Sequence, residues 1–144
     1  MKEKILIIAL CFVFMFFIVS VANATTLTFK VPIAELDDFD LKTDDGKLKL
    51  NNLSIKKANS FMSRTLHTIN VSIAAQNRSD NPICFSITIF AGTKDGPIFG
   101  LSAEPMMGTI SGQTTELIKE SVYIDPERSL DGATVWINVI GDFK

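Results

Sequence analysis

Strict alternation of apolar and other residues in two stretches of the chain is the feature that most constrains its fold. In residues 69–75 and again in residues 83–91 every second side chain is apolar, and most of the positions between carry Ser, Thr, Asn or Cys. A period of two places the apolar residues on one face of a β-strand, whereas a helix needs spacings of three and four. Both stretches are therefore predicted to be strands with one buried face.

Other segments show the same pattern and are separated by turn residues. The further predicted strands cover residues 26–31, 48–50, 53–55, 98–101, 114–124 and 135–140. Residues 114–124 also fit helical spacing, but their β-branched residues favour a strand. The alternation changes phase at Asn51 and Asn52, which predicts a β-bulge or a break there. Turns are predicted at Asp45-Gly46, 77–82, Asp95-Gly96-Pro97, 108–113 and Asp131-Gly132.

This spacing of strands and turns predicts an all-β fold. About seven or eight short strands, with a turn signal every dozen residues or so, are typical of an immunoglobulin-like antiparallel β-sandwich. Trp136 is expected to anchor one end of the core between the two sheets.

Residues 1–24 have the three-part layout of a secretory signal peptide. Lys2 and Lys4 precede an apolar run over residues 5–21, and the small residues Ala22 and Ala24 follow, so cleavage is expected after Ala24. A retained membrane anchor is the alternative, although a span needs about 20 apolar residues. We expect residues 25–144 to form a single β-sandwich domain that is exported to the periplasm, the cell surface or the medium.

Charge and cysteine content limit the partners and the means of stabilisation. The full chain has 14 basic and 16 acidic residues, and removal of residues 1–24 leaves 12 and 15, a formal charge of −3. Such a surface argues against nucleic acid as a partner, because phosphate binding needs a clustered cationic face. Cys84 is then the single cysteine. It is expected to be buried in its strand, and an intermolecular disulfide is the alternative.

The order of turns in the middle of the chain resembles a known family. A strand ends in Asn77-Arg78-Ser79-Asp80, the next strand leads to Asp95-Gly96-Pro97, and Gly112-Gln113 precedes a late strand. Over residues 66–124 this order resembles the FxLYD-type and related immunoglobulin-like domains of bacterial exported proteins. The aromatic residue and the Asp that precede the second turn in the family are shifted here, with Gly92 and Thr93 intervening, and the late turn lacks the acidic residue and the proline of the family pattern. The resemblance implies a β-sandwich and an exported location, and it implies no catalytic residue.

The sequence offers three candidate sites: His67, an acidic run and an apolar patch. None of them predicts a catalytic, cofactor-binding or metal-binding residue. His67 is expected at the rim of the core. The run from Glu35 to Asp45 holds six carboxylates, which is either a calcium site or, as we expect, a solvated acidic loop. The residues of the third candidate could form an exposed apolar patch that binds a partner, although we expect them to lie in the core. Its members are Phe61, Met62, Phe99, Met106 and Met107.

The expected function is that of a non-enzymatic exported module that binds another protein or a cell-envelope component through its loops or sheet edges. No cofactor, no nucleic acid and no membrane span after leader cleavage are expected, and the oligomeric state is left open. One alternative is a structural subunit that assembles by strand addition, with Thr25 to Val31 as the donor strand. A metal-dependent enzyme is the other alternative.

Overall fold

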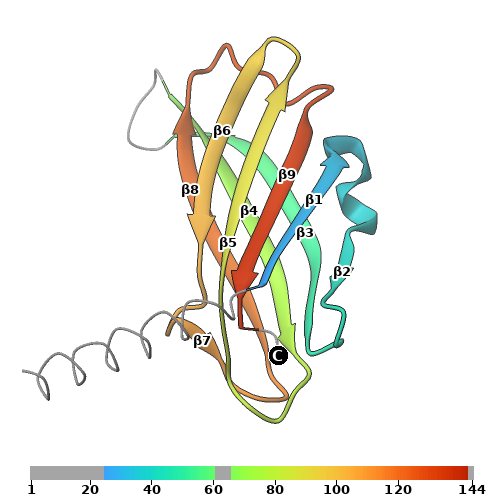
Figure 1. The fold of residues 1–144 in the computed structure, drawn as a ribbon. Coiled ribbons are helices and arrows are strands. Elements are labelled where there is room, and N and C mark those ends of the chain that lie inside the picture. The colour runs from blue at the N-terminus through green and yellow to red at the C-terminus, as the bar shows by residue number, and fades with distance from the viewer. Residues whose placement is uncertain (1–24, 61–65, 143–144) are drawn as a thin grey trace, which may run out of the picture.

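Two antiparallel sheets packed face to face form the molecule. The computed structural model describes residues 25–60 and 66–142, so the predicted signal peptide and the pair Phe61 and Met62 lie outside the described residues. The predicted all-β class and antiparallel β-sandwich are confirmed (Figure 1). The elements are β1 (Thr25–Pro32), the 3-10 helix η1 (Ile33–Asp38), β2 (Asp40–Lys42), β3 (Leu48–Asn59), β4 (His67–Asn77), β5 (Ile83–Thr93), β6 (Gly96–Ala103), β7 (Thr109–Ile110), β8 (Thr115–Ile124) and β9 (Thr134–Gly141).

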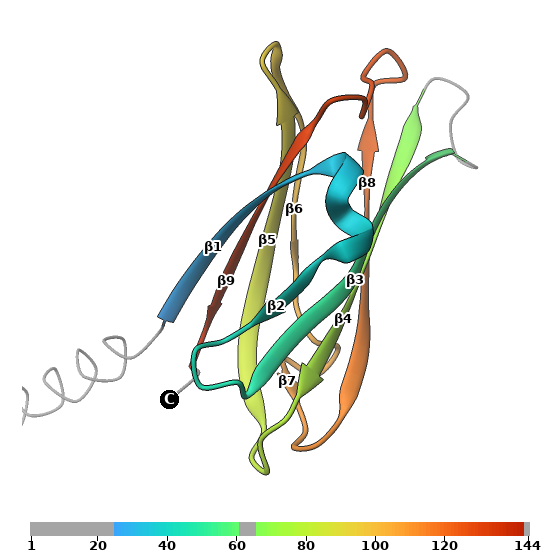
Figure 2. The ribbon, with the colours of Figure 1, turned by 90° about the vertical axis from the view of Figure 1, so that its right-hand side faces the viewer.

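The first and last strands of the described chain, β1 and β9, are neighbours in one sheet. Sheet A has the order β1-β9-β5-β6, with β7 paired to β5, and sheet B has the order β2-β3-β4-β8. β1 and β9 pair along their whole length, with Thr25 opposite Gly141 and Pro32 opposite Thr134. Figure 2 shows the two layers from the side, with η1 leading from β1 in sheet A to β2 in sheet B.

The core lies between the sheets and consists of the alternating apolar residues. The strands predicted from residues 69–75 and 83–91 are confirmed, and each turns its alternating apolar residues inward, whereas Phe90 in the second faces outward. The largest apolar side chains below 2% exposure are Leu48, Leu50, Ile69, Ile73, Ile87, Ile89, Ile110, Val135, Ile137 and Val139. Burial of each such side chain contributes about 1.5–3 kcal/mol, so the paired inner faces supply the main driving force for folding.

The predicted irregularity in β3 is confirmed as a β-bulge. The register between β3 and β4 shifts between Asn51 and Ser54, and Asn52 has a φ of 52°. Leu50 and Leu53 are both buried, at 0% and 2% exposure, although their separation of three residues would put them on opposite faces of a regular strand. The bulge therefore keeps the apolar face of β3 on the core.

One core prediction is wrong. Trp136 lies on the outer face of sheet A, because it alternates with Val135 and Ile137, which are both fully buried. The pleat of a strand sends successive side chains to opposite faces, so these three residues cannot all face the core. The structure also contains the short elements η1, β2 and β7, which are too brief to show a readable period.

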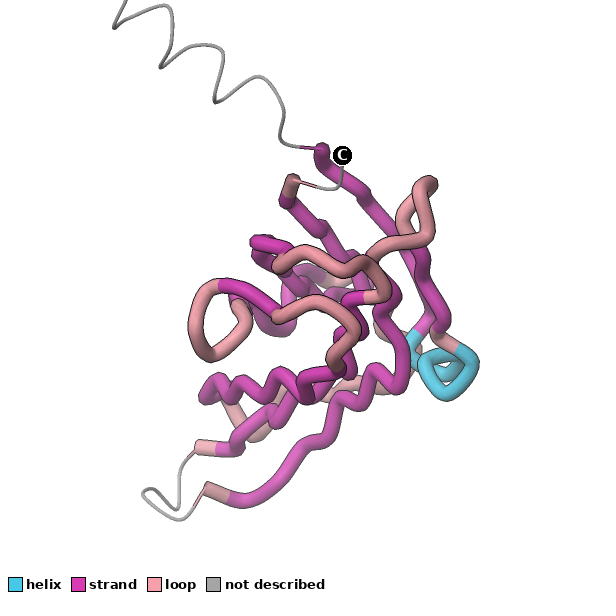
Figure 3. Tube along the Cα trace, turned by 90° about the horizontal axis from the view of Figure 1, so that it is seen from below, coloured by secondary structure: helices cyan, strands magenta, loops and turns pink. Residues whose placement is uncertain are grey.

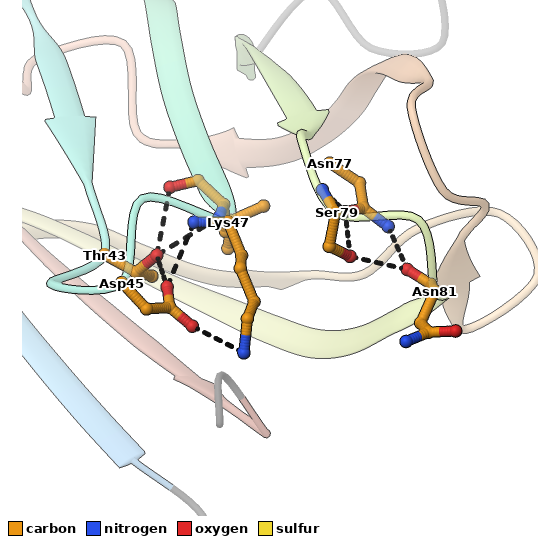
Figure 4. Close-up of polar contacts among 7 residues, drawn as sticks. Thr43, Asp45, Lys47, Asn77, Ser79 and Asn81 are labelled. Carbon is orange, nitrogen blue, oxygen red and sulfur yellow. Dashed lines mark hydrogen bonds and ion pairs between the residues drawn. The ribbon is translucent and has the colours of Figure 1, made fainter.

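A buried asparagine holds the turns at the lower end of the sandwich (Figure 4). Figure 3 shows the loops of this end from below. Asn77 is fully buried, and its Nδ2 donates to the carbonyl oxygens of Asn81 at 2.7 Å and Ile110 at 3.0 Å. Its Oδ1 accepts from the backbone N–H of Ser79 at 2.9 Å and from Ser79 Oγ at 2.8 Å. One side chain thus links the β4–β5 turn to β7, and the buried amide is fully hydrogen-bonded.

Replacement of Asn77 by Ala should lower the free energy of unfolding by about 2–3 kcal/mol, because carbonyl oxygens in a buried site lose their donors. Urea unfolding measures this as a lower midpoint with an unchanged slope. The control Asn70→Ala removes an exposed side chain that accepts from Ser121 Oγ, and it should cost about 0.5 kcal/mol or less. Equal losses in the two variants would contradict a special role for Asn77.

Candidate functional site

A row of residues with two aromatic side chains crosses the outer face of sheet A. The row, here called the aromatic row, consists of Lys30 on β1, Trp136 on β9, Phe90 on β5 and Gly100 on β6. Trp136 lies directly opposite Lys30 on one side and Phe90 on the other. Phe90 is 45% exposed, which is a large apolar surface for a strand residue. The pleat and the register of the sheet thus place the two aromatic residues side by side on the solvent side.

One glycine gives the Phe90 ring room to lie against the sheet. A Cβ atom at Gly100 would lie 2.8 Å from Cδ1 of Phe90, whereas a Cβ atom at Gly92 would lie 3.6 Å from Cζ3 of Trp136, an ordinary van der Waals contact. The Phe90 ring therefore covers the Gly100 backbone, where any other residue would push it aside. On the other side of the row, Nζ of Lys30 lies 5.7 Å from the centre of the indole, which is a cation–π contact.

A second row, here called the hydroxyl row, runs beside the aromatic row. Its members, in the order of the strands, are Thr28, Asn138, Thr88 and Ser102. All four side chains are exposed or partly exposed. None of the four makes a side-chain hydrogen bond to another described residue, so their hydroxyl and amide groups face solvent. Among the residues of the two rows, Lys30 is the single charged group.

The outer face of sheet B has a different character. A shallow hollow of about 300 Å³ crosses β3, β4 and β8 there. It is lined by Ser54, Lys56, Asn70, Val71, Ser72, Lys119, Glu120 and Ser121. The hollow on sheet B is therefore charged, whereas the two rows on sheet A carry a single charge, that of Lys30.

The lower end of sheet A corrects two further predictions. Cys84 is exposed, because it alternates with the buried residues Ile83 and Phe85 on β5. Met106 and Met107 are 91% and 84% exposed in the loop between β6 and β7, so they are not part of the core. Phe99, at 6% exposure, is a core residue as expected.

Cys84 lies beside a further shallow hollow at this end. The hollow measures about 360 Å³ and is also lined by Ile140 and Gly108. Gly108 follows Met107 in the loop between β6 and β7. Ile140 is 43% exposed. Glu104 and Asp142 also line the hollow, so this end of sheet A is accessible and combines apolar residues with carboxylates. It lacks the two neighbouring aromatic residues of the aromatic row.

The six carboxylates of the acidic segment are divided among three elements. Glu35, Asp37 and Asp38 belong to η1, Asp40 to β2, and Asp44 and Asp45 to the turn before β3. Asp40 forms an ion pair with Lys49 at 3.1 Å, and Asp45 forms one with Lys47 at 3.0 Å. Across residues 25–60 and 66–142 no three His, Cys, Asp or Glu side chains are grouped to hold a metal ion.

His67 lies where it was expected, at the rim of the core. It is the first residue of β4, is partly exposed, and pairs across the sheet with Asn59 and Ile124. Sequence reasoning missed the aromatic row, since Phe90 and Trp136 were each placed in their strand without their pairing. The outward phase of Phe90 on β5 and of Trp136 on β9, each between inward residues, was the available signal.

Asp45 organises the turn between β2 and β3 (Figure 4). Slight desolvation acts to raise the pKa of this exposed carboxyl, but it is outweighed by hydrogen bonds from Thr43 Oγ1 at 2.6 Å and from the Lys47 N–H at 3.0 Å, together with the nearby Lys47 ammonium. The pKa of Asp45 therefore lies below its ordinary value. The carboxylate stabilises the turn, which makes a structural role sufficient to explain it.

Replacement of Asp45 by Asn should remove a stabilisation that depends on pH. Because the pKa is lowered in the folded state, the carboxylate contributes stability above the unfolded pKa of about 3.9, and this is lost as pH falls through the folded value. The stability difference between wild type and Asp45→Asn should be constant near neutral pH and shrink in acid, as thermal unfolding at several pH values would measure. A difference that grows in acid would contradict this assignment. The control Asp44→Asn removes a charge from the same turn.

Comparisons with known proteins leave the function open. Neither a protein-family model nor a curated protein sequence matches the chain. Among solved structures, the Avr2 effector protein from the fungal plant pathogen Fusarium oxysporum is similar, with 11% identity and a TM-score of 0.34 over 81% of this chain and 86% of that chain. Similarity at this level carries no conclusion about activity. Within the described part of the chain, no helix is long and apolar enough to cross a membrane.

Proposed function

We propose that the protein is an exported, non-enzymatic β-sandwich module that binds a component of the cell envelope, or a protein held there, through the outer face of sheet A. The aromatic row is the observation that carries this proposal. Phe90 and Trp136 lie side by side on a solvent-facing sheet surface, where polar residues would serve folding equally well. Contiguous exposed apolar surface of this kind marks interaction sites in soluble proteins.

The exposed part of the Phe90 side chain can contribute free energy to binding. Burial of a Phe side chain contributes about 1.5–3 kcal/mol, and in the free protein nearly half of Phe90 remains exposed to water. A partner that covers the Phe90 ring gains the part of this burial free energy that the free protein does not. Because Gly100 and the backbone beneath the ring already hold it in place, little side-chain entropy is lost on binding.

Export is part of the proposal and is supported by sequence. The charged start, apolar run and small residues of 1–24 have the layout of a signal peptide. The resemblance of residues 66–124 to FxLYD-type and related immunoglobulin-like domains of bacterial exported proteins supports the same location. Domains of that kind are mostly of unknown or binding function.

Strand addition is the less favoured alternative. The proposed donor strand, Thr25 to Val31, already pairs with β9 of its own chain over its whole length. Leu27, Phe29 and Val31 turn inward and pack against the core. Donation to a second copy would require these contacts to be released, so the closed sandwich favours a binding module over an assembling subunit.

The variant Phe90→Ser should weaken binding of the processed, exported protein to isolated cell-envelope fragments by about tenfold or more, which corresponds to about 1.4 kcal/mol. Co-sedimentation over a range of protein concentrations measures the change. Leu117→Ser is the matched control, because Leu117 is 53% exposed on β8 of sheet B and its loss should leave binding unchanged.

Two results would contradict the proposal. Wild-type protein that fails to sediment with envelope fragments would remove the envelope as the partner's location. An equal loss in Phe90→Ser and Leu117→Ser would show that general surface apolarity, and not the aromatic row, governs the association.

A further inference from the structure

We propose that the aromatic row and the hydroxyl row together bind a neutral glycan chain. This inference rests on the proposed function, since it names the chemical class of the envelope component. The two rows run across the four main strands of sheet A, so they form an extended site on an open face and not a closed pocket.

The chemistry of the two rows matches the two kinds of surface on a sugar ring. One face of a pyranose ring carries C–H groups, which are attracted to the electron-rich face of an aromatic ring. The rim of the sugar carries hydroxyl groups, which need donors and acceptors. Phe90 and Trp136 supply the aromatic surface, and the hydroxyl row supplies side chains that make no hydrogen bonds to other described residues.

The spacing of the rows fits the same ligand. Residues two apart on a strand lie on the same face about 7 Å apart, so the hydroxyl row lies about 7 Å from the aromatic row. Thr88 is two residues from Phe90, and Asn138 is two residues from Trp136. A sugar unit stacked on either ring therefore has a polar side chain within reach of its rim.

Charge argues for a neutral ligand. Lys30 is the one charged group among the residues of both rows, and it already lies 5.7 Å from the centre of the Trp136 ring. An anionic polymer or a nucleic acid would find more cationic side chains on sheet B, where Lys56 and Lys119 line the hollow. A protein partner usually places anchor side chains in pockets. On the open face of sheet A the two rings instead provide a surface on which a ligand can stack.

The single tryptophan makes the site directly observable, because Trp136 is the one Trp in the chain. We would titrate the processed protein with neutral oligomers of glucose and of N-acetylglucosamine and follow Trp fluorescence. The expected result is a saturable change with at least one of these oligomers. Its midpoint should stay the same at low and high salt, because stacking and hydroxyl hydrogen bonds are not screened as charges are.

Three variants test whether the signal comes from the aromatic row. Phe90→Ser removes one ring, and Gly100→Ala keeps the ring but displaces it, since the new Cβ would lie 2.8 Å from Cδ1 of Phe90. Each should raise the midpoint of the titration about tenfold or more. Leu117→Ser should leave it unchanged. Thermal unfolding near that of wild type in all three would exclude loss of the fold as the cause.

The glycan inference and the proposed function fail by different results. Digestion of the envelope fragments with protease should leave co-sedimentation unchanged whatever the composition of the envelope glycan, because protease does not cleave glycan chains. Envelope binding that is lost on digestion, and that depends on Phe90 in the undigested fragments, would overturn the glycan and keep the proposed function. A fluorescence response that disappears at high salt would overturn neutrality, and a response equally weakened in Leu117→Ser would overturn the site.

Discussion

Burial of alternating apolar residues between two sheets is the interaction on which the rest of the structure depends. Without residues 1–24 the chain has one cysteine, so no internal disulfide can support the fold, and the inner faces of the strands must provide the stability. Fully buried residues such as Ile69 on β4 and Ile89 on β5 do this in both sheets. The bulge near Asn52 and the buried Asn77 are local adjustments that keep strands and turns compatible with that core.

The same constraint fixes the outer face of sheet A. Burial of Ile89 and Ile137 determines which face of β5 and β9 is turned to the core. Their chain neighbours Phe90 and Trp136 therefore point outward. A register slip of one residue would exchange the two faces, so a stable core also secures the pairing of the rings. The candidate site thus needs no scaffold beyond the sheet itself.

The strands and the bulge could be predicted from the sequence because they depend on a few neighbouring residues. The order of the strands in each sheet could not. The strands at 69–75 and 83–91, the bulge at Asn51 and Asn52, and the strand at 114–124 follow from period and phase over a few residues. The order of strands does not, because β9 pairs with both β1 and β5, which are far from it in sequence. Cys84 and Trp136 were assigned to the core from residue type, although their alternation with buried neighbours places them outside.

The position of Trp136 tests this account most directly, because core burial, pleat and register all determine it. Nuclear Overhauser contacts of the indole protons in the processed protein are the measurement. The account expects contacts from the indole to the Phe90 ring and to the Lys30 methylene groups. Contacts from the indole to core side chains such as Ile87 or Val139 would contradict it, since they would place the ring between the sheets.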